Sequence, residues 1–477
     1  MENNLPKGWI SISPLAIAEK IRGVSYGKED VFNENGNGRI PVLRANGIED
    51  NKIKYDDIVY VSSDNVNSNQ ILKTGDVLIA MSSGSKNLVG KTAQFFGDNK
   101  VSFGAFCGVL RPNQNINPKY FGYYFQSKDY RNTISEVAAG TNINNLKNEH
   151  FESLRIPIPP LPEQQRIVAK LDELMEKIER SRARLERIPQ ILKRFRQSVL
   201  SAAVSGKLTE KWRERNGSLK VIDNVVNFSI KNSDPIFNEN SWLVSRVSSV
   251  YDSFGGGTPS RSEKRYWNGG ISWVSSGDVK TDYITSGSES ITRAGLENSS
   301  AKLCPVDSVI VVVRSGILQH TLPVAIVKSE VAINQDIKCF NSISKDLNNW
   351  LFLVLKGKAK EILSQNREGT TVQSVKMETL KDLEIEIPST EEQTEIFKKV
   401  EELLLFADKI ESRYNKAKAQ LDKLPQSLLA KAFRGELVPQ DENDEPASVL
   451  LGRIKGEEAG TGVLRGNSTK RSVRALF

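Results

Sequence analysis

The residues best suited to chemistry lie in short loops that combine glycine, hydroxyl and basic side chains. Two such loops are "FGGGTPSRSEKRYW" at 254–267 and "ISWVSSGDVK" at 271–280. Arginine can bind guanine through two hydrogen bonds and asparagine can bind adenine in the same way, whereas Ser, Thr and Lys side chains position phosphates. These residue types therefore favour contacts to nucleic acid over bond-making chemistry.

Comparable loops occur in both halves of the chain, and this recurrence favours a binding role. For any single residue, an ordinary polar loop remains an equally good interpretation. In the second half the candidate DNA-binding residues are Thr258, Ser260, Arg261, Ser275, Ser276, Lys280, Arg314 and Ser315. In the first half the counterparts are Arg44, Asn46, Ser82, Ser83, Ser85 and Lys86.

Motifs for nucleotide or methyl-donor chemistry are incomplete. "GSKNLVGKT" at 84–92 looks like a phosphate-binding loop, but five residues separate Gly84 from Gly90 where that motif requires four. "FGAFCG" at 103–108 lacks the acidic residue that follows a methyl-donor loop, and the chain has no Asn-Pro-Pro-aromatic motif. A glycine-rich turn is the simpler interpretation, and we expect no catalytic residue.

The histidine and cysteine content argues against a metal site. His150 and His320 are the only histidines, and neither lies in a nucleophile or ligand motif. The three cysteines, Cys107, Cys304 and Cys339, form no CxxC pair. We therefore expect no metal, and reduced, mostly buried thiols as in a cytoplasmic protein.

Charge and hydropathy narrow the class of protein. The 477 residues carry a net charge of +8 and a pI near 9.1, which suits a polyanionic partner, although many enzymes share this balance. No stretch approaches the ~20 apolar residues that span a bilayer, and the start lacks the features of a signal peptide. We expect roughly two to four domains, no membrane partner and a cytoplasmic location.

One segment of the chain occurs twice. "LRIPIPPLPEQQRIVAKLDEL" at 154–174 matches "LEIEIPSTEEQTEIFKKVEEL" at 383–403, with an offset of 229 residues. The same offset relates Gly140-Thr141 to Gly369-Thr370, Gln197-Ser198 to Gln426-Ser427 and Gly206 to Gly435, and Trp9 and Trp242 are 233 apart. Two copies indicate a duplicated half-molecule rather than a longer repeat array.

Downstream of each motif, apolar residues recur in steps of four and three, which predicts a long helix with one heptad seam. The predicted helix-pairing residues are Ile167, Leu171, Leu174, Ile178, Leu185 and Leu192 in the first helix, and Ile396, Val400, Leu403, Ile410, Leu421 and Leu428 in the second. The same register places Ser181 and Ala417 on the seam. We expect antiparallel pairing within the chain, and an intermolecular coiled coil is the alternative.

Prolines and glycines predict where these helices break and end. Pro189 and Pro425 lie inside the heptad patterns and should bend or break the helices. The two positions are not related by the offset of 229, so the breaks should fall at different places. Gly206 and Gly435 should end the helices.

The predicted fold class is α+β, with two pseudo-repeated globular domains, head 1 and head 2, separated by two long antiparallel coiled-coil helices. The heads should contain short strands and helices near 119–136 and 347–363. The predicted division is head 1 at 1–155, a central spacer helix region at 156–210, a linker and head 2 at 211–388, a C-terminal spacer helix region at 389–438 and a C-terminal tail at 439–477.

Three segments carry a resemblance to a known family. "IPIPPLPEQQRIVAKLDEL", "LPQSLLAKAFRGELVPQDENDEPASVLL" and "GGGTPSRSEKRYWNGGISWVSSGDV" resemble the specificity subunit of type I restriction–modification systems. The likeness covers nearly the whole chain, including the order of heads and helices. The basic tail "TKRSVRALF" at 469–477 departs from the family pattern.

The resemblance implies that the heads are target recognition domains, each reading one half of a bipartite, asymmetric double-stranded DNA site. It implies that the helices set the gap between the halves and dock two methyltransferase (modification) subunits, which bring S-adenosylmethionine. Motor-nuclease (restriction) subunits would use ATP and Mg²⁺, and this chain would hold no cofactor. The family's Gly-Thr-Thr loop corresponds to Thr370 and Thr371, and its first copy to Thr141 and Asn142.

Two other functions remain open on the sequence alone. A non-enzymatic stand-alone DNA-binding regulator or scaffold would need no modification partner. An autonomous enzyme is disfavoured because the catalytic motifs are missing.

Overall fold

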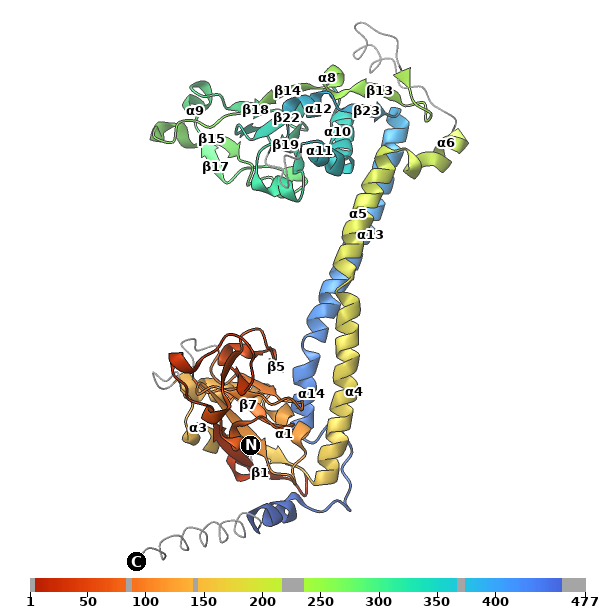
Figure 1. Cartoon of the computed structure of the whole chain (residues 1–477). Helices are drawn as coiled ribbons and strands as arrows, with labels where there is room; N and C mark the ends of the chain where they lie inside the picture. Colours follow the sequence, from red (N-terminus) through yellow and green to blue (C-terminus); the bar gives the residue numbers. More distant parts are fainter. Residues whose placement is uncertain (1–4, 83–87, 140–144, 217–235, 367–373, 457–477) are drawn as a thin grey trace, which may run out of the picture. The chain divides into compact units, whose positions relative to one another are not determined.

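The computed structural model describes residues 5–82, 88–139, 145–216, 236–366 and 374–456 (Figure 1). The chain forms two compact units: unit 1 comprises 1–185 and 416–477, and unit 2 comprises 186–415. Each unit therefore unites one head with segments of both long helices. The five-part division predicted above follows the order of the chain, whereas the two units are defined by contacts in space, which join the helices to the heads.

Head 1 contains one larger antiparallel sheet and several small ones. The larger sheet has the order β2 (Ala18–Arg22), β10 (Cys107–Pro112), β7 (Val77–Ala80) and β8 (Thr92–Gln94). The smaller sheets are β6 (Val59–Ser62), β3 (Arg39–Leu43) and β9 (Ser102–Phe103); β1 (Ile10–Ile12) and β11 (Ile156–Ile158); and β4 (Ile48–Glu49) and β5 (Lys52–Ile53). The helices are α1 (Pro118–Tyr124), α2 (Lys128–Ala139) and α3 (Asn148–Glu152).

Head 2 repeats this plan with longer sheets. A five-stranded sheet has the order β14 (Asp252–Gly255), β22 (Ile337–Asn341), β19 (Val309–Val312), β20 (Val324–Val327) and β16 (Tyr283–Ile284). A four-stranded sheet has the order β17 (Glu289–Ile291), β15 (Trp267–Val274), β21 (Val331–Ile333) and β18 (Lys302–Cys304), and a three-stranded one has β12 (Ile236–Phe237), β13 (Leu243–Arg246) and β23 (Glu384–Ile387). The helices of unit 2 outside the long pair are α6 (Glu210–Asn216), α8 (Val247–Val250), α9 (Arg293–Glu297), α10 (Lys345–Gly357), α11 (Ala359–Gln365) and α12 (Met377–Lys381).

The helices expected near 119–136 and 347–363 are each two helices, so that prediction was wrong in detail. α1 ends at Tyr124 and α2 begins at Lys128. Ser127 Oγ accepts a hydrogen bond from Tyr130 N at 3.2 Å, which caps the start of the second helix. The cap starts a new helix although the apolar periodicity of the sequence continues without a break, so the periodicity alone did not indicate two helices.

The long helices are interrupted next to their prolines, as predicted. The first run is α4 (Leu161–Leu185) and α5 (Ile188–Val204), and the second is α13 (Thr390–Leu421) and α14 (Leu424–Phe433). Pro189 and Pro425 lie in the first turns of α5 and α14, where a missing N–H costs no helical hydrogen bond. Gly206 (φ 76°) and Gly435 (φ 74°) follow the helices in the left-handed conformation, as expected of terminating glycines.

The helices pair in antiparallel directions within each unit. In unit 1, Arg182 near the end of α4 contacts Asp422, which lies just before α14. In unit 2, Arg196 on α5 contacts Asp408 on α13 at 2.7 Å, whereas Leu208 beyond the end of α5 accepts a hydrogen bond from Lys399. Residue numbers thus rise along one helix as they fall along its neighbour.

The predicted helix-pairing residues are all buried or half-buried. The buried ones are Ile167, Leu171, Ile178, Leu192, Ile396 and Val400, and the half-buried ones are Leu174, Leu185, Leu403, Ile410, Leu421 and Leu428. Ser181 and Ala417, which the heptad register also places on the seam, are exposed. The apolar seam is therefore interrupted at these two positions.

Each head packs its helices and the long helices into one core. In unit 1, Tyr120 on α1 meets Phe433 on α14 edge to face, with ring centroids 5.3 Å apart. In unit 2, Val199 on α5 and Ile396 on α13 lie in one core with Trp242 and Trp350, whose rings meet edge to face at 5.5 Å. Within the described ranges, no helix combines the length and apolar character that crossing a bilayer requires.

Leu171→Ala should destabilise unit 1 by roughly 2–5 kcal/mol, because a fully buried leucine leaves a cavity. Leu171 is 0% exposed and lies in the core shared by head 1 and the long helices. Chemical denaturation followed by tryptophan fluorescence would measure the change. The matched control is Leu424→Ala, at a 44% exposed position of the same unit, with an expected change of about 0.5 kcal/mol or less. Equal effects would contradict the packing described here.

Candidate nucleic-acid interface

A buried tryptophan joins each head to the first turn of a long helix. Trp9 Nε1 donates a hydrogen bond to Glu163 Oε2 at 3.0 Å, and Trp242 Nε1 donates to Glu392 Oε2 at 2.8 Å. Both carboxylates lie near helix N-termini, where the helix dipole favours negative charge. The repeated Glu therefore fixes where each helix begins relative to its head.

The repeated glutamine next to this Glu completes the junction. Gln164 Nε2 donates to Pro159 O at 3.0 Å, and Gln393 Nε2 donates to Pro388 O at 2.9 Å. Each proline directly follows the last strand of its head. The pattern Pro-x-x-x-Glu-Gln thus clamps the end of a strand to the start of a helix, which explains why the chain repeats it.

The two junctions differ in how the carboxylate is satisfied. Glu392 Oε1 accepts a hydrogen bond from Thr209 Oγ1 at 2.7 Å and pairs with Arg213. Glu163 Oε1 is buried and accepts no hydrogen bond from the described residues. Burial raises the pKa of Glu163, although the bond from the Trp9 indole opposes this shift.

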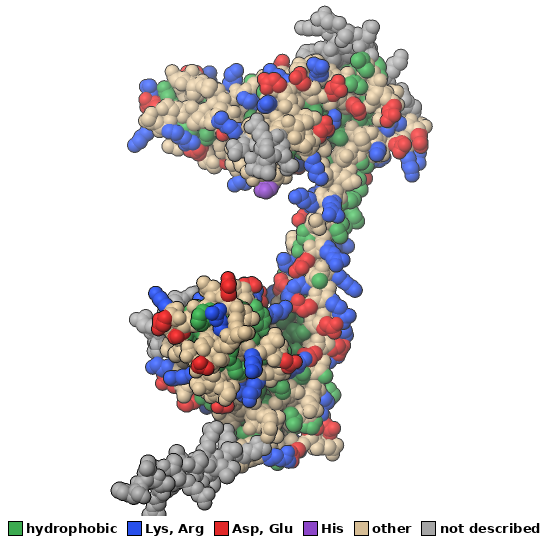
Figure 2. All heavy atoms as spheres, in the orientation of Figure 1, with side chains coloured by type: hydrophobic (Ala, Val, Ile, Leu, Met, Phe, Trp, Pro, Cys, Tyr) green, Lys and Arg blue, Asp and Glu red, His purple; other side chains and the backbone are tan. Residues whose placement is uncertain are grey.

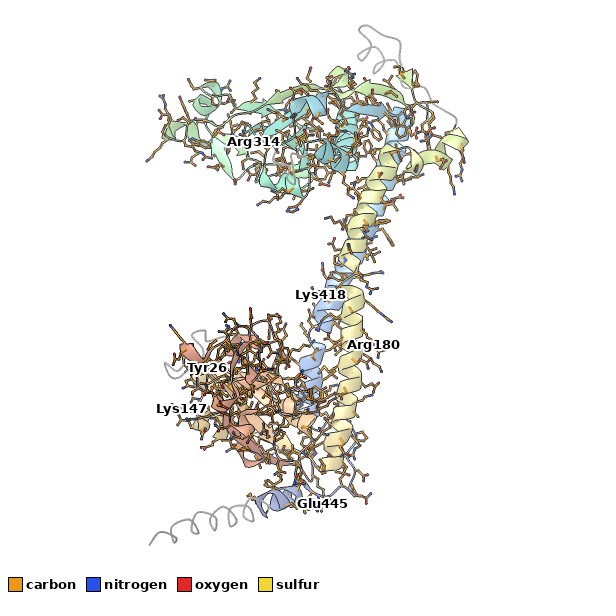
Figure 3. All side chains as sticks on the ribbon, viewed as in Figure 1. Tyr26, Lys147, Arg180, Arg314, Lys418 and Glu445 are labelled. Atoms are coloured by element: carbon orange, nitrogen blue, oxygen red, sulfur yellow. The ribbon has the colours of Figure 1, made fainter. Side chains whose placement is uncertain are left out.

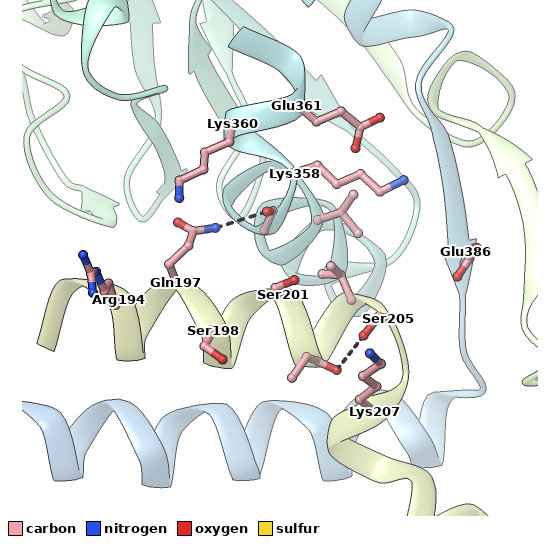
Figure 4. A pocket seen from close by; sticks show the side chains of 14 residues that line it. Arg194, Gln197, Ser198, Ser201, Ser205, Lys207, Lys358, Lys360, Glu361 and Glu386 are labelled. Carbon is pink, nitrogen blue, oxygen red and sulfur yellow. Dashed lines mark hydrogen bonds between the residues drawn. The ribbon is translucent and has the colours of Figure 1, made fainter. Parts of the chain in front are cut away.

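A second repeated glutamine ties the other long helix to the same head. Gln197 Nε2 on α5 donates to Gly357 O at the end of α10 at 3.2 Å (Figure 4). Gln426 on α14 donates to Gln126 O and accepts from Lys128 N, both at 2.9 Å, between α1 and α2. In both copies the motif glutamine therefore satisfies backbone groups where one helix of the head ends.

In head 2, Arg261 is held on an aromatic surface. Its Nη1 and Nη2 atoms donate to Glu289 Oε1 and Oε2 at 2.5 and 2.7 Å. The guanidinium carbon lies 3.9 Å from the centroid of the Trp267 ring and 5.4 Å from that of Trp273. The two contacts fix the plane of the guanidinium while more than half of the side chain stays exposed.

The segment 334–336 brings two further predicted residues together. Thr258 Oγ1 donates to Gln335 Oε1 at 2.6 Å, and Arg314 Nε donates to Asp336 Oδ1 at 2.6 Å. Trp273 Nε1 also donates to Gly257 O at 3.0 Å, which links the strand under Arg261 to the loop of Thr258. The structure thus gathers Thr258, Arg261 and Arg314 through neighbouring loops of head 2.

The predicted serines of head 2 have local structural partners. Ser275 donates through N and Oγ to Asp278 Oδ2, at 2.8 and 2.7 Å. Burial alone would raise the pKa of Asp278, but hydrogen bonds from Ser275 and Ser288 lower it overall. Ser315 Oγ accepts from Ile317 N at 3.5 Å and caps a short helix.

The remaining predicted residues of head 2, Ser260, Ser276 and Lys280, make few contacts with the rest of the head. Ser260 is exposed and its hydroxyl lies 2.8 Å from that of Ser262. Ser276 is half-buried and Lys280 is exposed. Among the described contacts, none joins Lys280 to the group around Arg261.

In head 1, Arg44 is the best-positioned candidate. Its Nη2 atom pairs with Asp57 Oδ1, and its Nε donates to Asp57 O at 3.3 Å. Burial raises the pKa of Tyr26, which is labelled in Figure 3, although the positive charge of Arg44 opposes the shift.

The other described candidates of head 1 are Asn46 and Ser82. Asn46 is exposed on the turn that follows Arg44, whereas Ser82 is half-buried and pairs with Asn145 in a β-bridge.

Ser83, Ser85, Lys86, Thr141, Asn142, Thr370 and Thr371 lie outside the described residues. They stay predictions.

The sequence did not reveal the acidic partners of the arginines. Asp57, Glu289 and Asp336 are separated from their arginines by 13, 28 and 22 residues along the chain. No motif or periodicity links residues at such separations. Trp267 and Trp273 were visible in the quoted loops as aromatic residues, but their stacking on Arg261 was not.

Charge on the visible surface is mixed. Figure 2 shows Lys and Arg side chains interspersed with Asp and Glu over the visible face of each head. Arg180 and Lys418 on the long helices point outward, and Arg314 lies on head 2 (Figure 3). On that face, local groups of residues rather than one large basic patch would have to recognise a polyanion.

The described residues contain no group of three or more His, Cys, Asp or Glu side chains placed to hold a metal ion. The three cysteines are unpaired and buried. Burial raises the pKa of Cys107 to about 12, which keeps this thiol protonated and unreactive at neutral pH.

Two segments of the chain match a known protein family. Residues 6–190 and 239–419 match the type I restriction modification DNA specificity domain. Together these segments cover more than half of the chain, one in each copy of the internal repeat.

Individual relatives cover almost the whole chain. The EcoKI specificity subunit of the type I restriction enzyme from Escherichia coli K12 is 36% identical over 96% of this chain and 97% of its own length. The StySPI specificity subunit from Salmonella potsdam is 34% identical over 98% of both chains.

Two solved structures share the fold. One, from a study of complex assembly and conformational transition of the type I R-M system, superposes with a TM-score of 0.62 over 91% of this chain and 99% of that chain, at 19% identity. The HsdS subunit from Thermoanaerobacter tengcongensis gives a TM-score of 0.57 over 91% of this chain and 98% of its own, also at 19% identity.

Glu163→Gln and Glu392→Gln should have different effects. Because the pKa of Glu163 is raised in the folded protein, folding takes up a proton just above the ordinary glutamate pKa, and unit 1 gains stability as pH falls through that range. Glu163→Gln should remove this gain and be neutral or stabilising at pH 7. Glu392→Gln removes the charge that faces Arg213 and should cost roughly 2–3 kcal/mol in unit 2.

The measurement is urea denaturation of both variants between pH 4.5 and 7.5. The wild type and Glu163→Gln should differ in the slope of stability against pH. Parallel slopes, or a greater loss in Glu163→Gln than in Glu392→Gln at pH 7, would contradict the assignment.

Proposed function

This chain belongs to the type I restriction modification DNA specificity family, and we propose that it is the DNA sequence-specificity subunit of a type I restriction–modification complex. Each head reads one half of a bipartite, asymmetric double-stranded DNA site. The long helices set the gap between the halves. The chain supplies recognition and no catalytic group.

One observation carries this proposal: the same set of junction contacts holds two different sets of loops. The Trp–Glu and Gln–carbonyl contacts recur in both units with nearly equal distances. The loops around Arg44 and Arg261 have different sequences and different contacts. A frame that is kept while its loops diverge suits a protein that presents two different readers to one duplex.

The partners follow from the family. We infer that two methyltransferase subunits dock on the helices and bring S-adenosylmethionine, and that motor-nuclease subunits using ATP and Mg²⁺ join for cleavage. The complex would work in the cytoplasm. The relatives described above are named as specificity subunits of restriction enzymes, which does not support a stand-alone regulator or scaffold.

Mapping methylated adenines across the genome, in cells with and without this chain, tests the proposal. Cells with the chain and its modification subunit should carry a methylated motif of two unlike half-sites around a fixed unspecified gap. Cells without the chain should lack this motif. A methylation pattern that does not depend on the chain would contradict the proposal.

The gap-setting role has its own test. Deleting seven residues from α5 and the seven that lie opposite them on α13 removes one heptad from each helix, or about 10 Å, which corresponds to roughly three base pairs. The methylated motif should keep both half-sites and shorten its gap. An intact motif with an unchanged gap would contradict the ruler role.

A further inference from the structure

The arginines predicted to contact DNA share a feature that the proposed function does not explain. Each is paired with a carboxylate from a separate segment of the same head: Asp57 and Asp336 lie in loops, and Glu289 is the first residue of β17. The three pairs are Arg44 with Asp57, Arg261 with Glu289 and Arg314 with Asp336.

Stability does not account for these pairs. The arginine side chains are 46%, 57% and 63% exposed, and exposed ion pairs contribute little to stability. None of the pairs joins adjacent turns of a helix, where such contacts follow from the sequence spacing. Their exposure leaves all three arginines accessible to a ligand.

The carboxylates cancel positive charge where a phosphate backbone would approach. Binding to DNA of any sequence depends largely on Lys and Arg side chains that neutralise phosphates. An arginine that already has a carboxylate partner gains less from a phosphate, and its partner repels the phosphate. Each carboxylate therefore weakens sequence-independent binding at its position.

The carboxylates also fix the orientation of the arginines. Glu289 occupies one donor on each Nη of Arg261, which leaves the Nε edge available while Trp267 holds the guanidinium plane. Asp336 Oδ1 accepts from both Nε and Nη2 of Arg314, which leaves Nη1 available. A guanidinium held in this way can meet the edge of a base with little loss of side-chain freedom.

Asp336 is itself held in place. Asp336 Oδ2 accepts from Asn334 Nδ2 at 3.2 Å, and Asp336 N donates to Asn334 Oδ1 at 3.1 Å. Asn334 is buried. The orientation of Arg314 thus traces back to the core of head 2 through Asp336.

We propose that Asp57, Glu289 and Asp336 are specificity-determining residues, which position the arginines for base contacts and reduce the affinity for DNA of the wrong sequence. This inference rests on the proposed function. It assigns to these residues a role in discrimination rather than in total affinity.

Equilibrium binding by the chain assembled with its modification subunits tests the inference, at one fixed salt concentration. One duplex carries the site found by methylome mapping, and the other is a scrambled duplex of equal length and composition. Glu289→Gln should bind the scrambled duplex more tightly and lower the ratio of the two affinities by about tenfold, the discrimination expected of one bidentate arginine–base pair.

The matched control is Glu297→Gln, which removes the same charge from an Arg–Glu pair on α9 of the same head. It should leave the ratio of affinities unchanged. In an Arg261→Ala background, Glu289→Gln should have no further effect on the ratio, because Glu289 acts through Arg261. Base-pair substitutions in the duplex should show that Glu289→Gln relaxes preference in one half-site only, and that Asp57→Asn relaxes it in the other.

An unchanged ratio in Glu289→Gln, or an equal fall in Glu297→Gln, would overturn the inference and leave the proposed function intact. A wild-type complex that binds both duplexes equally would overturn the proposed function and this inference with it.

Discussion

The architecture depends on a hydrogen bond between a buried indole and a buried carboxylate at the start of each long helix. An indole N–H can only donate, and one oxygen of each carboxylate accepts its hydrogen bond. The other oxygen is bound by Thr209 and Arg213 in Glu392, whereas in Glu163 it accepts no hydrogen bond from the described residues. The carboxylate also lies at the positive end of a helix dipole. Because tryptophan comes from the head and glutamate from the helix, this bond sets the position of one relative to the other within each unit.

The rest of each unit extends this constraint. The glutamine after the glutamate holds the end of a strand, and a second glutamine on the opposing helix holds the backbone between two helices of the head. Both long helices are thereby fastened to the same head. The loops can then change sequence without loosening the frame, since none of these bonds involves them.

Much of this could be predicted from the sequence because the information is local. The heptad steps predicted the long helices, Pro189 and Pro425 predicted their breaks, and Gly206 and Gly435 predicted their ends. The motif glutamates and glutamines were visible as a repeat, but their partners lie about 150 residues away or in the backbone, so no local pattern indicates them. The carboxylates beside the arginines were missed for the same reason, because pairing between segments far apart in the chain leaves no periodic pattern.

The central claim is that one duplicated frame carries two independent readers. Replacing residues 1–155 with the corresponding segment of a relative that keeps the junction tryptophan tests it most directly, with methylated adenines mapped across the genome. The account predicts that one half of the methylated motif changes while the other half stays the same. A change in both halves, or in neither with methylation retained, would contradict it.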